Sequence, residues 1–169
     1  MTPTIRSEAA GDAPAIHALT RDAFQSAPHT SHTEQHVVDA LREAGVLSLS
    51  LVAEEGGRLI GHVACSPVVI DEGAVTGWFG LGPISVLPER QGRGVGALLM
   101  RAALSELRSR GAAGVVLLGD PAYYARFGFA AVASLVLPDV PPEVFQALSF
   151  SGGFPAGVVR YHAAFDATG

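Results

Sequence analysis

A short glycine-rich segment carries the strongest chemical signal in this chain. Residues 91–96, Gln-Gly-Arg-Gly-Val-Gly, lie between a strand-like run, 81–87, and a helix-like run that continues to about Arg110. Glycine allows backbone N–H groups to turn inward and lets an anion approach without a Cβ in the way. The first turn of a helix leaves N–H groups without partners, and the helix dipole adds partial positive charge there. The segment therefore predicts a cradle for phosphate groups.

A plain structural turn and a dinucleotide-binding loop are the alternatives to a phosphate cradle in this segment. A strand–helix turn without a ligand needs fewer glycines, since each interior glycine costs roughly 0.5–1 kcal/mol relative to alanine. The spacing Gly92-x-Gly94-x-x-Ala97 also fits a dinucleotide-binding loop, with Asp120 downstream as the acidic residue. Against that fit, residues 88–91 separate the strand from the glycines, and too little βα repeat follows. A Walker loop is excluded because no Lys-Ser/Thr pair follows the glycines.

Two helices are expected after a short first strand at residues 4–6. The first helix begins at Ala13, where Asp12 is placed to cap it. The second starts with the capping-box spacing of Ser31 and Glu34. Both helices carry apolar residues at helical spacing, so each should bury one face.

A β-hairpin and a long strand follow. The runs 47–54 and 58–70 flank Gly56-Gly57, and two glycines supply the positive φ angles that a tight hairpin turn needs. The next strand, 75–86, contains Gly82-Pro83, which predicts a bulge because proline cannot donate to the ladder.

The rest of the chain alternates short elements. Residues 115–118 read as a buried strand, Asp120 starts a short helix that Gly128 stops, a further short helix is expected near 144–148, and a last strand at 158–165. The helix after the glycine segment should bury a stripe made of Leu98, Leu99, Ala102, Ala103 and Leu107. This order predicts one domain, 1–169, with a mixed α/β (α+β) sheet and helices on its faces.

Composition excludes several classes of protein. A formal charge of -5 and a pI near 5.6 argue against nucleic acid as the main partner. The apolar run 112–118 is too short to span a bilayer, and residues 1–10 lack the pattern of a signal peptide. The single Cys65 cannot form an internal disulfide, which favours a reducing compartment. We therefore expect a cytoplasmic protein without membrane partners.

The spacing Gln-x-x-Gly-x-Gly resembles the pyrophosphate signature of the GCN5-related N-acetyltransferases (GNAT), and the order of elements matches that family over nearly the whole chain. Residues 119–129, Gly-Asp-Pro-Ala-Tyr-Tyr-Ala-Arg-Phe-Gly-Phe, look like the YhbS-like group of predicted acetyltransferases, as do residues 159–162, Val-Arg-Tyr-His. The resemblance implies a mostly antiparallel sheet of about seven strands and about four helices, splayed between the fourth and fifth strands.

The resemblance also implies an activity. Acetyl-CoA would be the co-substrate, and its acetyl group would pass directly, in a ternary complex, to a primary amine of a small molecule or peptide. The backbone of the fourth strand would pair with the pantetheine arm at Ile84, Ser85 and Val86, and the Val86 N–H would stabilise the oxyanion. The residues expected at the pyrophosphate are Gln91, Gly92, Arg93, Gly94, Val95, Gly96 and Ala97.

By the same resemblance, Tyr124 is the expected acid for the leaving thiolate. It heads the motif Tyr-x-x-x-Gly-Phe, in which the family places a tyrosine near the CoA sulfur. A phenol with a pKa near 10 is neutral at pH 7 and can donate a proton. Tyr123 is the adjacent alternative. Arg90 and Arg93 flank the glycine segment as phosphate ligands or as plain surface charges.

The general base is left open by the sequence. The candidates are Glu34, His32, His62, Asp120 and His162, with ordered water as a further alternative. The six histidines show no metal-binding spacing, the nearest set being His29, His32 and His36, so no metal is expected. Cys65 reads as a small buried hydrophobe.

Two questions about the whole protein also stay open. The rival to an enzyme is a non-catalytic acyl-CoA-binding or sensor module, which would keep the glycine segment and lose the acid. Residues 12–45 and the segment from Ser134 are expected to shape the acceptor pocket, as in the family. GNAT proteins are often dimers, so a homodimer is one expectation.

Overall fold

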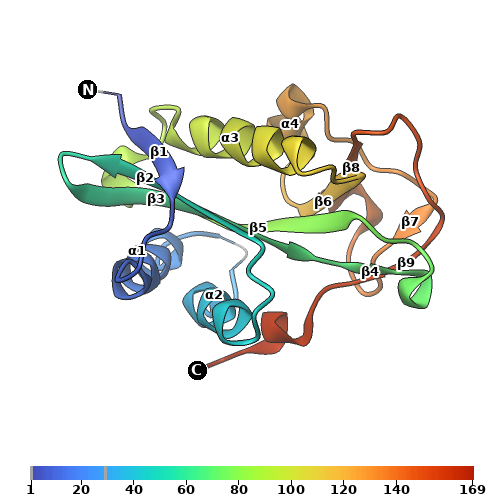
Figure 1. Cartoon of the computed structure of the whole chain (residues 1–169), viewed down its shortest axis with the longest axis horizontal. Helices are drawn as coiled ribbons and strands as arrows, with labels where there is room; N and C mark the ends of the chain where they lie inside the picture. The colour runs from blue at the N-terminus through green and yellow to red at the C-terminus, as the bar shows by residue number, and fades with distance from the viewer. Residues whose placement is uncertain (1, 29) are drawn as a thin grey trace. The chain divides into compact units, whose positions relative to one another are not determined.

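The computed structural model describes residues 2–28 and 30–169 (Figure 1), and it divides into two compact units. Unit 1 comprises Met1–Ser66, Pro83–Leu104 and Ala163–Gly169, whereas unit 2 comprises Pro67–Gly82 and Ser105–His162. Both units are therefore assembled from separate stretches of sequence. The expectation of a single domain stays a prediction.

Unit 1 is built on an antiparallel sheet. Strand β1 (Thr4–Ser7) pairs with β2 (Leu49–Glu55), and β2 pairs with β3 (Arg58–Pro67). The hairpin turn between β2 and β3 is made by Gly56 and Gly57, whose φ angles are 59° and 80°. These are the left-handed values that the Gly-Gly pair predicted.

Helices cover both faces of this sheet (Figure 1). Helices α1 (Ala13–Phe24) and α2 (Glu34–Glu43) lie on one side, where Ile16, Val38 and Val52 form a fully buried cluster. On the other side runs α3 (Val95–Ser109), and a Cβ added to Gly61 of β3 would approach Leu99 Cδ1 to 2.9 Å. Because side chains alternate along a strand, Gly61 faces α3 while His62 faces α1 and α2.

Helix α1 begins at Ala13 as predicted, but the side-chain caps expected for α1 and α2 were wrong. Asp12 makes no capping hydrogen bond; its Oδ2 accepts from Arg6 Nη1 at 2.8 Å and from the Ala9 N–H at 2.7 Å. Helix α2 begins at Glu34, so Glu34 is the first helical residue and not the third one that a capping box requires. Ser31 instead hydrogen-bonds the Thr33 hydroxyl at 2.6 Å. In both places the polar group that was expected to cap the helix is hydrogen-bonded to another side chain instead: Asp12 to Arg6, and Ser31 to Thr33.

The buried stripe of α3 shares three of its five residues with expectation. Its buried side chains are Val95, Leu99, Met100, Ala103 and Leu107. Leu98 is 38% exposed and Ala102 is half-buried, so neither lies in the buried stripe as expected. The reason is geometric: residues four apart stack on one helix face, so the series beginning at Val95 defines the buried side.

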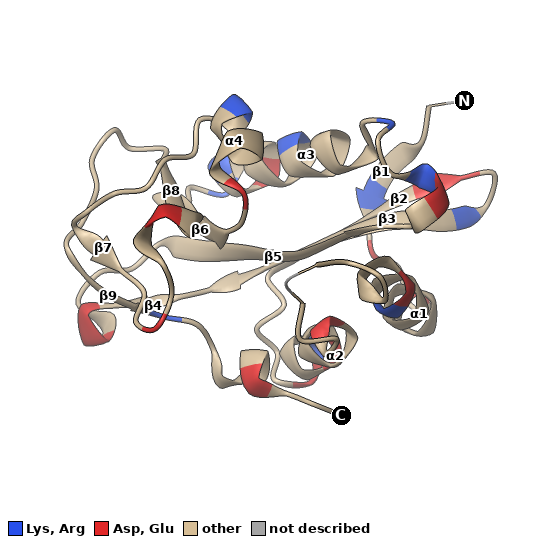
Figure 2. Cartoon of the chain, turned by 180° about the vertical axis from the view of Figure 1, so that it is seen from behind, with Lys and Arg blue, Asp and Glu red and all other residues tan. Residues whose placement is uncertain are grey.

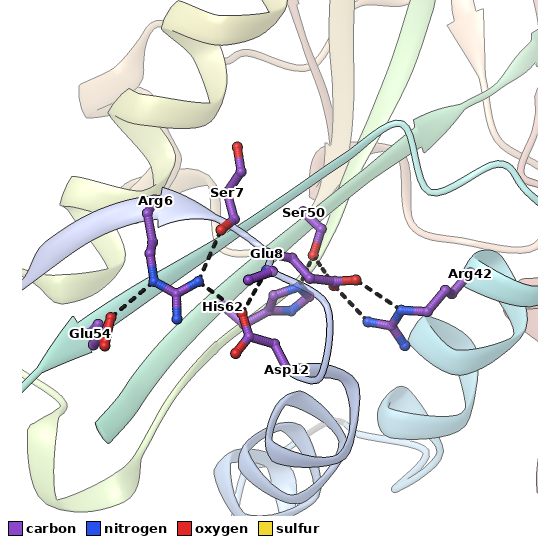
Figure 3. Close-up of polar contacts among 9 residues, drawn as sticks. Arg6, Ser7, Glu8, Asp12, Arg42, Ser50, Glu54 and His62 are labelled. Carbon is purple, nitrogen blue, oxygen red and sulfur yellow. Dashed lines mark hydrogen bonds and ion pairs between the residues drawn. The ribbon is translucent and has the colours of Figure 1, made fainter. Parts of the chain in front are cut away.

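A polar network lies between the sheet and α2 in unit 1 (Figure 3). Arg42 of α2 donates to both carboxylate oxygens of Glu8 at 3.0 and 2.7 Å, and Ser50 Oγ donates to Glu8 at 2.6 Å. The same hydroxyl lies 2.8 Å from His62 Nε2. Burial lowers the pKa of His62 from 6.5 to about 4. Burial also opposes ionisation of Glu8, but the hydrogen bonds from Arg42 and Ser50 outweigh it and lower that pKa.

The network predicts acid sensitivity of folding. Because the pKa of His62 is lower in the folded state, the unfolded chain binds the proton first as pH falls. The contribution of His62 is complete above pH 6.5 and is lost between pH 6.5 and about 4. We expect the free energy of unfolding to drop by about 3 kcal/mol over this window from this group.

Denaturant unfolding at pH 7, 5.5 and 4 measures this drop. A His62→Gln variant should lose most of the slope, whereas His162→Gln, at an exposed histidine, should keep it. An equal slope in the wild type and His62→Gln would show that His62 is not responsible.

Unit 2 contains strands of two sheets. The residues of β5 (Trp78–Val86) up to Gly82 belong to this unit and pair in parallel with β6 (Gly114–Leu118), which pairs antiparallel with β8 (Phe145–Ser149). A smaller sheet has the order β4 (Val69–Ile70), β9 (Gly157–Arg160) and β7 (Leu135–Val136). Their shared core consists of Val68, Ile70, Trp78, Val116, Leu135, Phe145, Ala147 and Val159.

Two expectations in the last third of the chain were wrong. The helix expected near 144–148 is strand β8, because Ala147 pairs with Val116 and Phe145 with Leu118 of β6. The last strand ends at Arg160, and a short 3-10 turn, Ala163–Asp166, takes the place of its second half. In contrast, the expected short helix is present as α4 (Pro121–Tyr124), and Gly128 ends the following turn at a φ of 95°.

The fold class is as expected. The described residues form nine strands and four α-helices, and most strand pairs are antiparallel. Within residues 2–28 and 30–169, no helix is long and apolar enough to cross a membrane.

Candidate functional site

The glycine segment is a loop that turns directly into α3. A short 3-10 turn, Pro88–Arg90, precedes it, and Gly92 and Gly94 then adopt φ angles of 76° and 83°. Open space surrounds the position that a Cβ would occupy at either glycine. Backbone conformation, and not crowding, is therefore what requires glycine here.

The start of α3 presents donors without backbone partners. The first hydrogen bond of the helix runs from the Leu98 N–H to the Gly94 carbonyl at 3.1 Å. The N–H groups of Val95, Gly96 and Ala97 come before it, and none donates to a carbonyl in the described part of the chain. Together with the helix dipole, they make a site that attracts an anion.

The polar side chains around the loop make different contacts. Gln91 donates its Nε2 to the Val86 carbonyl at 3.0 Å and so ties the loop to the end of β5. Arg90 pairs with Glu55 at 3.0 Å. Arg93 is exposed and makes no ion pair within residues 2–28 and 30–169. Figure 2 shows basic residues on this segment.

A cavity of about 390 Å³ adjoins the loop in unit 1; it is lined by Pro3, Glu55, Gly56, Arg90, Arg93 and Val95. The one cation on its wall that has no ion-pair partner in the described residues is Arg93. Unit 2 holds a second, larger cavity of about 610 Å³ beside β7 and β8, with mainly apolar walls such as Val132, Leu137 and Phe145.

The backbone N–H groups at the end of β5 point in alternating directions. The Leu87 N–H donates to Ile60 of β3 at 2.9 Å. Backbone N–H groups alternate along a strand, so those of Val86 and Ile84 point away from β3. Ser85 is 2% exposed, and its hydroxyl has no hydrogen-bond partner in the described residues.

The expected interruption of β5 is present. Gly82 has a φ of 145°, and Pro83 lacks an N–H. The parallel ladder between β5 and β6 ends earlier, at the pair Gly80 and Val116. The strand therefore pairs with β6 only through its first residues, as the predicted splay requires.

Tyr124 ends helix α4 in unit 2. Asp120 caps that helix by accepting from the Ala122 N–H at 3.0 Å. The ring of Tyr124 packs edge-on against Tyr123 at 4.9 Å and against Phe129 at 6.3 Å. Any side chain at Gly119 would collide with this ring. Burial raises the pKa of Tyr124, so its phenol is fully protonated at neutral pH.

Three candidates for the general base have structural partners. His62 is fully buried in the network of Figure 3. Asp120 is the cap of α4, and Glu34 accepts a hydrogen bond from the Thr30 hydroxyl while its Oε1 is buried without one in the described residues. These contacts explain why the three residues are where they are without reference to catalysis.

The other titratable candidates lie at the surface. His32 is exposed with a φ of 61°, and His162 is exposed as well. Cys65 is fully buried and forms no disulfide in the described residues, as expected of a small hydrophobe. His29, a member of the nearest histidine set by spacing, lies outside the described residues.

Comparison with known proteins decides the family. The protein-family model described as the acetyltransferase (GNAT) domain matches residues 4–132, about three quarters of the chain. The chain belongs to the GNAT acetyltransferase family.

Individual relatives agree with this assignment. The uncharacterized N-acetyltransferase YhbS of Escherichia coli K12 is 44% identical over 126 residues, which cover 74% of this chain and 72% of YhbS. A GNAT acetyltransferase from Brucella melitensis, solved with acetyl-CoA, is 50% identical with a TM-score of 0.87 and covers 97% of this chain and 98% of its own. The Escherichia coli YhbS structure, solved with CoA, has a TM-score of 0.88 at 38% identity, over 100% and 94% of the two chains.

Several expectations are confirmed by these comparisons. The GNAT fold, the likeness to the YhbS group and the enzyme class, an acyl-CoA-dependent N-acyltransferase, are as the sequence predicted. Two features could not be read from the sequence. Gly119 makes room for the Tyr124 ring, and the Gln91 amide donates a hydrogen bond to the Val86 carbonyl of the same chain. Nothing in the spacing distinguishes such internal contacts from ligand contacts.

Proposed function

We propose that this chain transfers the acetyl group of acetyl-CoA to a primary amine by direct transfer in a ternary complex. The observation that carries the proposal is the set of unpartnered N–H groups at Val95, Gly96 and Ala97, after two glycines with positive φ. A pyrophosphate accepts hydrogen bonds from such a set, and each bond to a charged group contributes about 1.5–3 kcal/mol. Arg93 adds a cation that no carboxylate in the described residues neutralises.

The end of β5 would bind the pantetheine arm and the thioester carbonyl of acetyl-CoA. The N–H groups of Ile84 and Val86 point away from β3, which makes them available to an extended amide-containing arm such as pantetheine. The Val86 N–H is our assignment for the oxyanion donor. The amine nitrogen forms a bond to the thioester carbon, the oxyanion accepts a hydrogen bond, and the C–S bond then breaks.

Tyr124 is the proposed proton donor to the departing thiolate. Its raised pKa keeps the proton on the phenol at neutral pH, so the group is an acid and not a base. The amine must lose a proton too, and ordered water serves as well as any of the candidate side chains.

The acceptor is a small-molecule or peptide amine whose identity the chemistry does not define. We also propose a cytoplasmic location, because a single cysteine cannot form an internal disulfide and Cys65 is buried. A homodimer remains a prediction.

Calorimetric titration of the purified chain with acetyl-CoA, with NADH as control, tests the proposal. Saturable binding of acetyl-CoA and none of NADH is expected, followed by amine-dependent release of CoA thiol in an acceptor screen. Absence of acetyl-CoA binding would overturn the proposed function. Binding of NADH would indicate that the glycine loop binds a dinucleotide. Binding without thiol release from any amine would favour a sensor module.

A further inference from the structure

We infer that His17, His36 and Asp39 form a binding site for a divalent transition-metal ion, Zn²⁺ being the best match. The site lies on α1 and α2 within unit 1 and is separate from the glycine loop. Each side chain offers one ligand atom, and these three atoms lie within 4.8 Å of one another. The acetyl-transfer steps proposed above assign no role to these three residues.

Helix packing explains how the three residues meet. His36 and Asp39 are three positions apart on α2, so they share one face of that helix. His17 of α1 follows Ile16, and Asp39 follows Val38; Ile16 and Val38 are fully buried in one cluster. Burial of that apolar pair brings the adjacent polar positions of the two helices together. Figure 1 shows α1 and α2 side by side.

The donor geometry is close to that of a metal site. His17 Nδ1 lies 2.6 Å from Asp39 Oδ2, and the His36 ring stands edge-on to His17 with centroids 5.5 Å apart. Metal bonds of about 2.0–2.2 Å from nitrogen and oxygen place tetrahedral ligand atoms about 3.3 Å apart. To reach that spacing, His17 Nδ1 and Asp39 Oδ2 would move apart from 2.6 Å, and all three atoms already lie within 4.8 Å of one another. The ion would take the place of the direct hydrogen bond between His17 and Asp39.

Arg42 lies beside the Asp39 carboxylate and helps to orient it. Arg42 Nη1 lies 3.5 Å from Asp39 Oδ1, and the same guanidinium is held by Glu8 at 2.7 Å. The charge of Arg42 is thus balanced by Glu8, and Oδ2 of Asp39 is the oxygen directed to His17. Such outer contacts fix ligand orientation in known metal sites.

The ligand set identifies the class of metal. Two imidazoles and one carboxylate favour zinc and similar transition metals over calcium or magnesium, which prefer oxygen ligands. The side chains of His17 and Asp39 are 32% and 36% exposed, which gives an ion a route of entry and leaves a fourth position for water. Because the ligands come from both helices, a bound ion would clamp α1 to α2.

Competition between the full chain, pretreated with a chelator, and a chromophoric zinc indicator tests the site. One equivalent of Zn²⁺ should bind to the wild type. His36→Gln and Asp39→Asn should each weaken binding at least about 100-fold, since changes in outer contacts alone lower metal affinity by about 10–100-fold. His32→Asn is the matched control, because this histidine is exposed near the same helix and asparagine tolerates its positive φ.

His36→Gln keeps the two ion pairs of Asp39 intact, so it separates ligand loss from loss of folding. Circular dichroism should confirm that it folds, and Zn²⁺ should raise the melting temperature of the wild type and of His32→Asn but not that of His36→Gln. If folded His36→Gln binds zinc as tightly as the wild type, or if His32→Asn weakens binding equally, the proposal is wrong. Lack of stoichiometric binding by the wild type would also overturn it.

Discussion

Replacing Gly94 with glutamate is expected to weaken acetyl-CoA binding at least about 100-fold, a loss near 2.7 kcal/mol. Gly94 has a φ of 83° directly before α3, so a side chain there strains the turn that aims the helical N–H groups. The added carboxylate would also face the pyrophosphate with like charge. Two or more charged hydrogen bonds at about 1.5–3 kcal/mol each would be lost or weakened. Calorimetry with acetyl-CoA measures the change.

Gly111→Glu provides the matched control. Gly111 follows α3, has a φ of 84° and, like Gly94, has open space around its missing Cβ. The two variants therefore carry the same backbone strain and the same added charge, and they differ in position alone. Equal acetyl-CoA affinity in the two variants would contradict a phosphate cradle at the start of α3.

Replacing Tyr124 with phenylalanine is expected to lower kcat about 100-fold or more, with the Kd for acetyl-CoA unchanged. General acid catalysis contributes about 10²–10⁴-fold to rate, and the hydroxyl is the only group that this substitution removes. The ring contacts with Tyr123 and Phe129 are kept, so the local fold should persist. Steady-state release of CoA thiol, together with calorimetry, separates turnover from binding.

Tyr123→Phe is the control for this prediction. Tyr123 is the adjacent tyrosine, and its ring lies under the Arg126 guanidinium at 4.4 Å, a contact that phenylalanine preserves. Its kcat should stay close to that of the wild type. Should Tyr124→Phe retain full turnover while Tyr123→Phe loses it, the acid would be Tyr123; full turnover in both would remove the tyrosine acid from the mechanism.

Residues with narrow local requirements were predictable. Gly56 and Gly57 in the hairpin turn, Gly92 and Gly94 in the loop, and Gly128 after α4 all have positive φ in the structure. Each of these conformations depends on the residue itself and its immediate neighbours. The cap of α4 by Asp120 was predictable for the same reason, since its acceptor and donor are two residues apart.

The sequence did not predict which of several possible partners a side chain or segment would contact in the folded protein. Asp12 has the residue type and position of a cap, yet Arg6 of β1 competes for its carboxylate. Residues 145–149 are apolar enough for either a helix or a strand, and pairing with β6 makes them a strand. These outcomes depend on groups brought close by folding, whose distance along the chain bears no relation to their distance in space.

The sequence alone determined the family, the glycine loop that opens α3 and the tyrosine after it, because these rest on spacing within a few residues. The tertiary structure decided that His62 is buried against Ser50 and Glu8, and that His17 lies beside His36 and Asp39. The physical reason is that a local motif constrains backbone angles, whereas burial and side-chain partners follow from the packing of helices and strands far apart in the chain.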